Sequence, residues 1–150
     1  MKKILMVCLG NICRSPLAEG ILKSKVNSNK VFVDSAGTGA YHVGNLPDSR
    51  SIAVAKKYSI DITNQKARKF SFDDFKEFDV IYAMDKNNYQ NIIALSISEE
   101  ELLKVKMILN EVKPNKNYEV PDPYYGGDAG FENVYRMLDD ACDVIADKLK

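Results

Sequence analysis

Apolar residues along the chain fall into two kinds of pattern. Four short runs rich in apolar residues, at residues 3–9, 31–35, 79–84 and 105–109, predict buried β-strands. Longer stretches with apolar residues at helical spacing predict helices over about residues 15–26, 47–58, 85–95 and 131–149. Strands that alternate with helices are typical of an α/β fold with a parallel sheet and right-handed crossovers.

The segments between these elements are short, polar or rich in glycine. Residues 60–62 are expected to be extended, residues 70–75 to form a short helical turn, and residues 99–101 an acidic turn. Residues 110–119 have no apolar period and predict irregular structure. There is no internal repeat, linker or low-complexity segment, so residues 1–150 are expected to form a single domain with its own core.

Charge changes sign along the chain. Residues 1–70 carry 12 Lys or Arg against 4 Asp or Glu, a balance of +8, and residues 71–150 carry 9 against 17, a balance of −8. The net charge of zero gives no bulk attraction to nucleic acid or to an anionic membrane. The basic first half instead favours a basic face that suits acidic substrates.

Cysteine and histidine are scarce. Three cysteines without spaced pairs suit free thiols in a reducing compartment, so we expect a cytoplasmic protein. One histidine and no cysteine pairs at ligand spacing argue against a structural zinc site. The apolar run before Cys8 is too short for a secretory signal, and no stretch approaches the roughly 20 apolar residues of a membrane span.

The stretch from Cys8 to Ser15 connects the first predicted strand to the first predicted helix. Such a turn directs backbone N–H groups and the positive end of a helix dipole at one point, which makes an anion site. The same field favours the thiolate of a cysteine, and the guanidinium of Arg14 can bind two phosphate oxygens. A cysteine that ends an apolar strand is usually a core residue, but its combination with Arg14 favours a nucleophile in a phosphate cradle.

Other phosphate-binding loops do not fit the sequence. The nucleotide-binding loop needs G-x-x-x-x-G-K-[ST], of which only Gly10 is present. The dinucleotide fingerprint fails because His42 stands where a third glycine should follow Gly37 and Gly39. We therefore expect a single phosphoryl group as the ligand. Ser15 is expected to cap the following helix, and its hydroxyl can also donate to a thiolate at position 8.

Several motifs, in order along the whole chain, resemble those of the low-molecular-weight protein tyrosine phosphatases. They are CLGNICRSPLAE at residues 8–19, DSAGT at 34–38, GNLPDSR at 44–50, AMD at 83–85 and DPYYG at 122–126. The first and last motifs together are highly specific. The resemblance implies a flavodoxin-like or Rossmann-like fold with a four-stranded parallel sheet flanked by helices in three layers. It also implies a cysteinyl-phosphate intermediate and no metal or other cofactor.

The resemblance assigns a role to particular residues. Cys8 matches the nucleophile, Arg14 the phosphate-binding arginine, and Asp122 the general acid that protonates the leaving phenol and then activates water. The residues whose backbone N–H groups match the phosphate cradle are Leu9, Gly10, Asn11, Ile12, Cys13, Arg14 and Ser15. The side chains that match the hydrogen-bonded shell holding this loop in shape are Asn11, Ser15 and Ser35.

Physical chemistry requires the same parts. Phosphoryl transfer depends on positioning and charge stabilisation, and a phenol leaving group needs an acid opposite an in-line nucleophile. Asp122 lies between two prolines that restrict its backbone; the alternative is a turn-forming aspartate. We expect neighbouring tyrosines to shield Asp122 partly from water, which favours the protonated form that an acid needs.

The expected substrate pocket combines loop and rim residues. Tyr124 and Tyr125 suit the walls of a slot for a planar ring, although tyrosines also commonly cover a core. Ile12 adds an apolar wall; related phosphoarginine phosphatases carry Thr at this position, so Ile12 favours phosphotyrosine. Tyr41 and His42 form the expected rim, where many relatives have Trp-His or a Tyr followed by an acidic residue. His42 is expected to be a rim residue rather than a catalytic base.

Specific roles are expected for three further residues. Cys13 is either a small packing residue or the partner of Cys8 in a reversible disulfide, which would make the protein redox-regulated. Cys142 lies on the apolar face of the last helix and is expected to be inert core. Gln65 stands where relatives usually carry a histidine that braces the loop asparagine.

Together these observations predict a metal-independent phosphatase for phosphotyrosine proteins and small aryl phosphates. The expected partners are phosphotyrosine proteins, with a tyrosine kinase as a further candidate, and phosphate or other oxyanions in the site, but neither nucleic acid nor membranes. Arsenate reduction on the same scaffold needs relay cysteines, and none occurs between Cys13 and Cys142. A phosphate-binding module without turnover is the remaining alternative, and it would need neither a nucleophile nor an acid.

Overall fold

Four parallel strands form one sheet in the computed structural model, which describes residues 1–125 and 127–150 apart from the side chains of Tyr125 and Asp128. The strands are β1 (Lys2–Cys8), β2 (Val31–Gly37), β3 (Val80–Ala83) and β4 (Val105–Met107), and their order in the sheet is β2-β1-β3-β4. All three neighbouring pairs are parallel. The predicted four-stranded parallel sheet is therefore confirmed.

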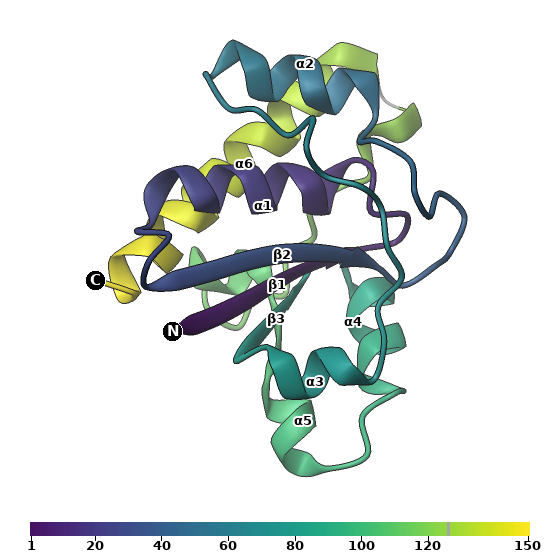
Figure 1. Ribbon diagram of the computed structural model, residues 1–150, viewed down its shortest axis with the longest axis vertical. Helices are drawn as coiled ribbons and strands as arrows, with labels where there is room; N and C mark the ends of the chain where they lie inside the picture. Colours follow the sequence, from purple (N-terminus) through teal and green to yellow (C-terminus); the bar gives the residue numbers. More distant parts are fainter. Residues whose placement is uncertain (126) are drawn as a thin grey trace.

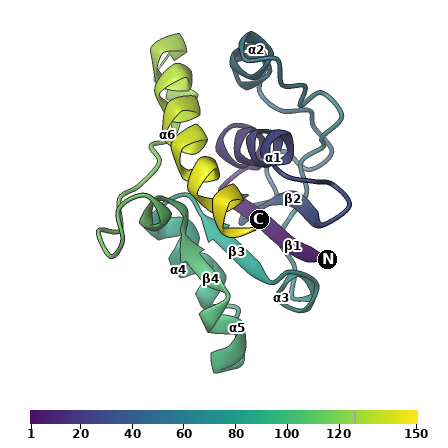
Figure 2. The same cartoon turned by 90° about the vertical axis from the view of Figure 1, so that its left-hand side faces the viewer.

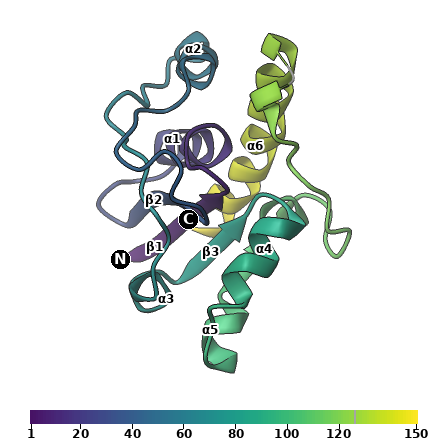
Figure 3. The same cartoon turned by 90° about the vertical axis from the view of Figure 1, so that its right-hand side faces the viewer.

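Helices cover both faces of this sheet in three layers (Figures 1 and 2). On one face lie α1 (Arg14–Lys25) and α6 (Gly127–Lys148), with α2 (Ser49–Lys57) packed outside them. The other face carries α3 (Asp73–Glu77), α4 (Lys86–Ile93) and α5 (Glu99–Leu103), as the view from the opposite side also shows (Figure 3). Among the described residues, no helix combines the length and hydropathy that crossing a bilayer requires.

Two apolar cores form because side chains alternate along the central strand. Ile4, Met6 and Cys8 of β1 face the core under α1 and α6. Leu5 and Val7 face the core under α3 and α4. All five are buried, and fully burying an aliphatic side chain is worth about 1.5–3 kcal/mol. This double burial explains why the first strand is an unbroken apolar run.

The topology places several candidate residues at one edge of the sheet. The chain runs from β1 to β2 on one side and from β3 to β4 on the other, so the order switches between β1 and β3. Ligands of such sheets bind at the carboxyl ends of the strands beside this switch. Cys8 ends β1, and Asp85 follows two residues after β3. A site is therefore expected between them.

Some element boundaries differ from those predicted. The first helix begins at Arg14 and ends at Lys25, one residue earlier at each end than predicted. The predicted cap at Ser15 is wrong, because Cys13 occupies the cap position without a side-chain hydrogen bond. The Ser15 hydroxyl instead makes its hydrogen bonds inside the loop that precedes the helix.

Further differences lie in the second half of the chain. The fourth strand stops at Met107, because the 3₁₀ helix η1 (Ile108–Glu111) follows at once. Residues 99–103 form α5 rather than an acidic turn, since the Ser98 hydroxyl caps this helix. A second 3₁₀ helix, η2 (Pro123–Tyr125), precedes α6, which begins at Gly127 instead of residue 131. Residues 60–62 belong to no strand.

Candidate active site

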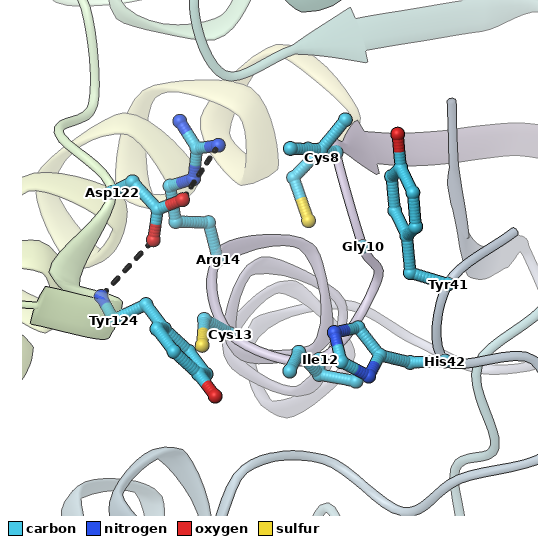
Figure 4. Close-up of a pocket in the computed structure, with 10 residues that line it drawn as sticks. Cys8, Gly10, Ile12, Cys13, Arg14, Tyr41, His42, Asp122 and Tyr124 are labelled. Atoms are coloured by element: carbon cyan, nitrogen blue, oxygen red, sulfur yellow. Dashed lines mark hydrogen bonds and ion pairs between the residues drawn. The ribbon is translucent and has the colours of Figure 1, made fainter. Parts of the chain in front are cut away.

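A pocket of about 410 Å³ opens at the carboxyl edge of the sheet. It brings together the loop after β1, the rim after β2 and the segment before η2 (Figure 4). The residues that line it are Cys8, Leu9, Gly10, Ile12, Cys13, Arg14, Tyr41, His42, Asp122 and Tyr124. The structure therefore unites most of the candidate residues; the side chain of Tyr125 and the whole of Gly126 lie outside the described part.

Cys8 lies at the base of this pocket and is 3% exposed. Its sulfur accepts the backbone N–H of Asn11 at 3.3 Å and lies 3.0 Å from the hydroxyl oxygen of Ser15. That oxygen already accepts a hydrogen bond from Asn11 Nδ2 at 2.8 Å, so the hydroxyl hydrogen is available for the sulfur. Two donors directed at the sulfur stabilise negative charge on it.

Arg14 begins α1 and is also 3% exposed. Its Nη1 donates to Asp85 Oδ2 at 2.7 Å and to the carbonyl of Val120 at 2.9 Å. Burial alone would lower the pKa of Arg14, but the negative charge of Cys8 and the hydrogen bond to Asp85 raise it. The guanidinium is therefore a permanently charged group with a fixed orientation in the pocket wall.

Asp122 lies beside Arg14 on the same side of the pocket, and Arg14 Nη2 and Asp122 Oδ2 are 3.9 Å apart (Figure 4). Its Oδ1 accepts the backbone N–H of Tyr124 at 3.0 Å, which fixes the carboxyl within its own turn. The side chain is 43% exposed. The expected shielding by tyrosines is therefore not seen in the described residues, and the carboxyl has direct access to water.

Aromatic and apolar side chains form the walls of the pocket, and we call the space between them the aryl slot. Its walls are Ile12, Tyr41, His42 and Tyr124. Tyr124 lies on one side of the pocket and His42 on the other, with Ile12 between them (Figure 4). The His42 ring packs on the loop backbone so closely that a Cβ on Gly10 would lie 3.0 Å from its Cδ2. Glycine at this position thus allows the rim to approach the loop.

A hydrogen-bonded shell holds the loop from behind, and Asn11 is its centre. The backbone of Asn11 has a positive φ of 58°, which asparagine tolerates better than most residues. Its Nδ2 donates to Ser15 and, at 3.0 Å, to Ser35, while its Oδ1 accepts the backbone N–H of Arg68 at 3.0 Å. Ser35 in turn donates to Glu19 at 2.6 Å. All three predicted shell residues therefore lie in one network.

Sequence reasoning missed two carboxylates of this site. Glu19 is buried, and burial raises the pKa of its carboxyl although hydrogen bonds from Lys23 and Ser35 act in the opposite direction. Asp85 anchors Arg14. The sequence position of each could have indicated a place at the site. Glu19 follows Ser15 by one helical turn and lies on the same helix face, and Asp85 comes directly after the third apolar run. The AMD motif at residues 83–85 contains Asp85, but the resemblance gave it no function.

Gln65 does not brace the loop asparagine. Its Nε2 donates to the carbonyl of Pro16 at 3.1 Å. The backbone N–H of Arg68 contacts Asn11 instead. Arg68 is itself held by ion pairs to Asp34 and Asp74, both at 3.0 Å. The hydrogen bond that Asn11 Oδ1 accepts from residues 65–68 therefore comes from the main chain of Arg68.

All three cysteines are free in this structure. Cys13 is buried in the pocket wall, and burial together with the charges of Asp48 and Cys8 raises its pKa to about 12. It is therefore a neutral thiol at physiological pH. The Cys142 sulfur lies in the core and makes a 3.8 Å hydrogen bond to the carbonyl of Ala18. This position fits the expected core role.

Comparisons with known proteins agree with this geometry. Residues 3–150 match the family model described as low molecular weight phosphotyrosine protein phosphatase. A Schizosaccharomyces pombe protein of that name is 44% identical over 143 residues, which cover 92% of this chain and 90% of the relative.

Solved structures are also similar. A protein tyrosine phosphatase from Entamoeba histolytica has a TM-score of 0.91 and 40% identity, covering 99% of this chain and 97% of that chain. A Drosophila arginine phosphatase has a TM-score of 0.89 and 33% identity, covering 100% and 98%. The similarity spans nearly the whole chain, including the strand-to-helix loop that carries the buried Cys8 and Arg14. The chain therefore belongs to the low molecular weight phosphotyrosine protein phosphatase family.

Proposed function

We propose that this protein hydrolyses phosphotyrosine in proteins, and small aryl phosphates, through a cysteinyl-phosphate intermediate. Residues 1–150 form the single domain that does this without a metal ion. One observation carries the proposal: Cys8, Arg14 and Asp122 line the same pocket, directly at the N-terminus of α1. A nucleophile, an anion clamp and an acid together exceed what a binding module needs.

In the first step the phosphoryl group binds the N–H groups of the loop formed by residues 9–15 and the guanidinium of Arg14. The Cys8 thiolate attacks phosphorus while the bond to the phenolic oxygen breaks. Asp122 transfers its proton to that oxygen, so the product leaves as a neutral phenol. Positive charge and backbone donors stabilise the transferring phosphoryl group throughout.

In the second step water hydrolyses the phosphocysteine. The Asp122 carboxylate, which is open to solvent, takes a proton from the water that attacks phosphorus. The sulfur–phosphorus bond breaks, and the electron pair returns to Cys8. The Ser15 hydroxyl and the Asn11 N–H lie at the sulfur and stabilise the departing thiolate. Inorganic phosphate then leaves and the site is restored.

The aryl slot favours phosphotyrosine over phosphoarginine. Ile12 gives the slot an apolar wall and Tyr124 a flat wall, and both suit a phenyl ring. A guanidinium would be poorly solvated against Ile12. The similarity to an arginine phosphatase shows that this alternative exists on the same scaffold. Phosphoserine is disfavoured because its short chain cannot bring the phosphate from a protein surface down to Cys8.

Cellular context is also part of the proposal. Free cysteines favour the cytoplasm, where phosphotyrosine proteins and a tyrosine kinase would be the partners. Peroxide would oxidise the Cys8 thiolate to a sulfenic acid, and the Cys13 thiol would then condense with it to a disulfide and release water. This reversible step would protect the nucleophile from further oxidation.

A substrate panel tests the proposal. Matched peptides that carry phosphotyrosine, phosphoarginine or phosphoserine are offered to the wild-type protein, Cys8→Ser and Ile12→Thr. We expect hydrolysis of phosphotyrosine by the wild type, none by Cys8→Ser, and a shift toward phosphoarginine in Ile12→Thr. Binding of the phosphotyrosine peptide without release of phosphate would favour the binding-module alternative. Preferred release from phosphoarginine by the wild type would contradict the substrate class.

A further inference from the structure

Arg50, on α2, contacts two aromatic rings, and one of them, Tyr124, belongs to the aryl slot. Its guanidinium carbon is 4.6 Å from the centroid of the Phe131 ring and 5.4 Å from that of the Tyr124 ring. Both distances fall within the range of cation–π interactions. Phe131 is buried in the core, whereas Tyr124 is a partly exposed wall of the pocket. Arg50 thus connects the buried ring of Phe131 to the ring of Tyr124 in the pocket wall.

Asp48 fixes the orientation of this guanidinium. Its two carboxylate oxygens accept hydrogen bonds from Nε and Nη2 of Arg50, each at 3.1 Å. The same carboxylate caps α2 by accepting the backbone N–H of Arg50 at 2.8 Å. A two-point contact sets the plane of a guanidinium as well as its position. The face that Arg50 presents to Tyr124 is therefore defined by Asp48.

The beginning of α2 is itself attached to the phosphate-binding loop. The backbone N–H of Asp48 donates to the carbonyl of Ile12 at 2.8 Å. The hydroxyl of Ser51, which is buried, donates to the carbonyl of Cys13 at 3.2 Å. A continuous series of contacts therefore runs from Ile12 through Asp48 and Arg50 to Tyr124. It joins two walls of the aryl slot that belong to opposite ends of the sequence.

We propose that Arg50 is a positioning residue that sets the place of the Tyr124 ring relative to Ile12, and so determines how tightly the slot holds an aromatic group. Arg50 is absent from the described residues that line the pocket, so it acts through Tyr124 and not by touching the substrate. The inference rests on the proposed function of the pocket as an aryl phosphate site. It concerns affinity for the ring and leaves the phosphate cradle unchanged.

Calorimetric binding of two anions separates these effects. Benzylphosphonate carries a ring that fills the slot, and inorganic phosphate contacts only the cradle. In Arg50→Gln we expect affinity for benzylphosphonate to fall about three- to tenfold, in line with one lost cation–π contact, and affinity for phosphate to stay within twofold. Arg136→Gln is the matched control, because Arg136 is 71% exposed on α6 and pairs with Glu132. It should change neither affinity.

A double-mutant cycle tests whether Arg50 acts through Tyr124. In a Tyr124→Ala background, Arg50→Gln should have no further effect on benzylphosphonate affinity. Arg50→Lys keeps the charge but lacks the planar fork, so it should lose most of the same affinity, and it replaces the Gln variant if the latter does not fold. With an aryl phosphate substrate, KM should rise and kcat should stay within twofold.

Two results would overturn this inference: equal losses for benzylphosphonate and phosphate, or an undiminished effect of the Arg50 substitution in the Tyr124→Ala background. The first would mean that Arg50 supports the loop in general, and the second that Arg50 acts independently of Tyr124. Both outcomes leave the proposed function intact. A wild-type protein that binds benzylphosphonate no better than phosphate would instead contradict the aryl slot itself, and this inference with it.

Discussion

Asp85 holds Arg14 through a 2.7 Å hydrogen bond between Oδ2 and Nη1, at a point where the arginine is almost fully buried. The other oxygen of the same carboxylate accepts the backbone N–H of Asn88 at 2.7 Å and caps α4. One carboxylate, two residues after β3, therefore fixes both the start of α4 and the guanidinium of Arg14. The orientation of Arg14 is therefore set by the protein's own side chains and backbone.

Asp85→Asn should weaken this hold without removing the helix cap, because an asparagine oxygen can still accept the Asn88 N–H. Loss of a charge-assisted hydrogen bond is worth about 1.5–3 kcal/mol, so we expect kcat/KM for an aryl phosphate to fall about 10- to 100-fold. The midpoint of thermal unfolding should also fall, because the buried guanidinium of Arg14 loses its charged partner. Steady-state kinetics and a melting curve check both points. A change in kcat/KM of less than twofold would show that Arg14 is oriented without Asp85.

Ser15→Ala removes the hydroxyl that lies 3.0 Å from the Cys8 sulfur. Because the thiolate is both the nucleophile and the leaving group, we expect kcat to fall at least about tenfold, from a lost hydrogen bond to a charged group. Ser24→Ala, on the same helix with its hydroxyl bonded to Ile21, is the control. Equal effects of the two substitutions would argue for a purely structural role.

Asp122→Ala should separate substrates by their leaving groups. A poor leaving group needs the proton of Asp122, whereas an activated phenol departs without it. We expect the loss in kcat/KM to be at least ten times larger for phosphotyrosine than for an aryl phosphate with an acidic phenol. A series of substituted phenyl phosphates measures this as a steeper dependence on leaving-group pKa. Parallel losses across the series would remove Asp122 from the acid role.

The Cys13 thiol should resist alkylation at neutral pH as long as residue 8 is not oxidised. Burial, reinforced by the charges of Asp48 and Cys8, raises its pKa to about 12, and only the thiolate is alkylated. In Cys8→Ser, iodoacetamide should therefore leave Cys13 unmodified at pH 7, and the labelling rate should rise about tenfold per pH unit from pH 8 to pH 10. Peptide mass spectrometry reads the modified position. Labelling of Cys13 at pH 7 at the rate of a free cysteine would contradict this protonation state.

Sequence patterns predicted the elements of this fold well where they were long or central. The apolar run of β1 is buried on both faces, and its carboxyl end brings Cys8 to the edge of the sheet where the pocket opens. The last helix was also expected, yet its first turn was missed, because residues 127–130 are small or polar and contribute nothing to an apolar period. Local signals such as the Ser15 cap failed because the loop uses that hydroxyl for the thiol.

The contacts that hold the site residues in place could not be predicted from sequence patterns. Glu19 and Asp85 act through partners that are distant in sequence, and a motif names residues without naming what they touch. Arg50 was part of a recognised motif, but its two rings belong to the other end of the chain. Only the folded arrangement shows that α2 joins the phosphate-binding loop to Tyr124.

The most direct test of the central claim is to trap the phosphoryl group on Cys8. Wild-type protein is mixed with an aryl phosphate, quenched in acid during turnover, and digested for mass spectrometry. The account predicts one phosphoryl group on the peptide that contains Cys8, its absence from Cys8→Ser, and no turnover by that variant. Steady hydrolysis of the substrate by Cys8→Ser at the wild-type rate would contradict the account.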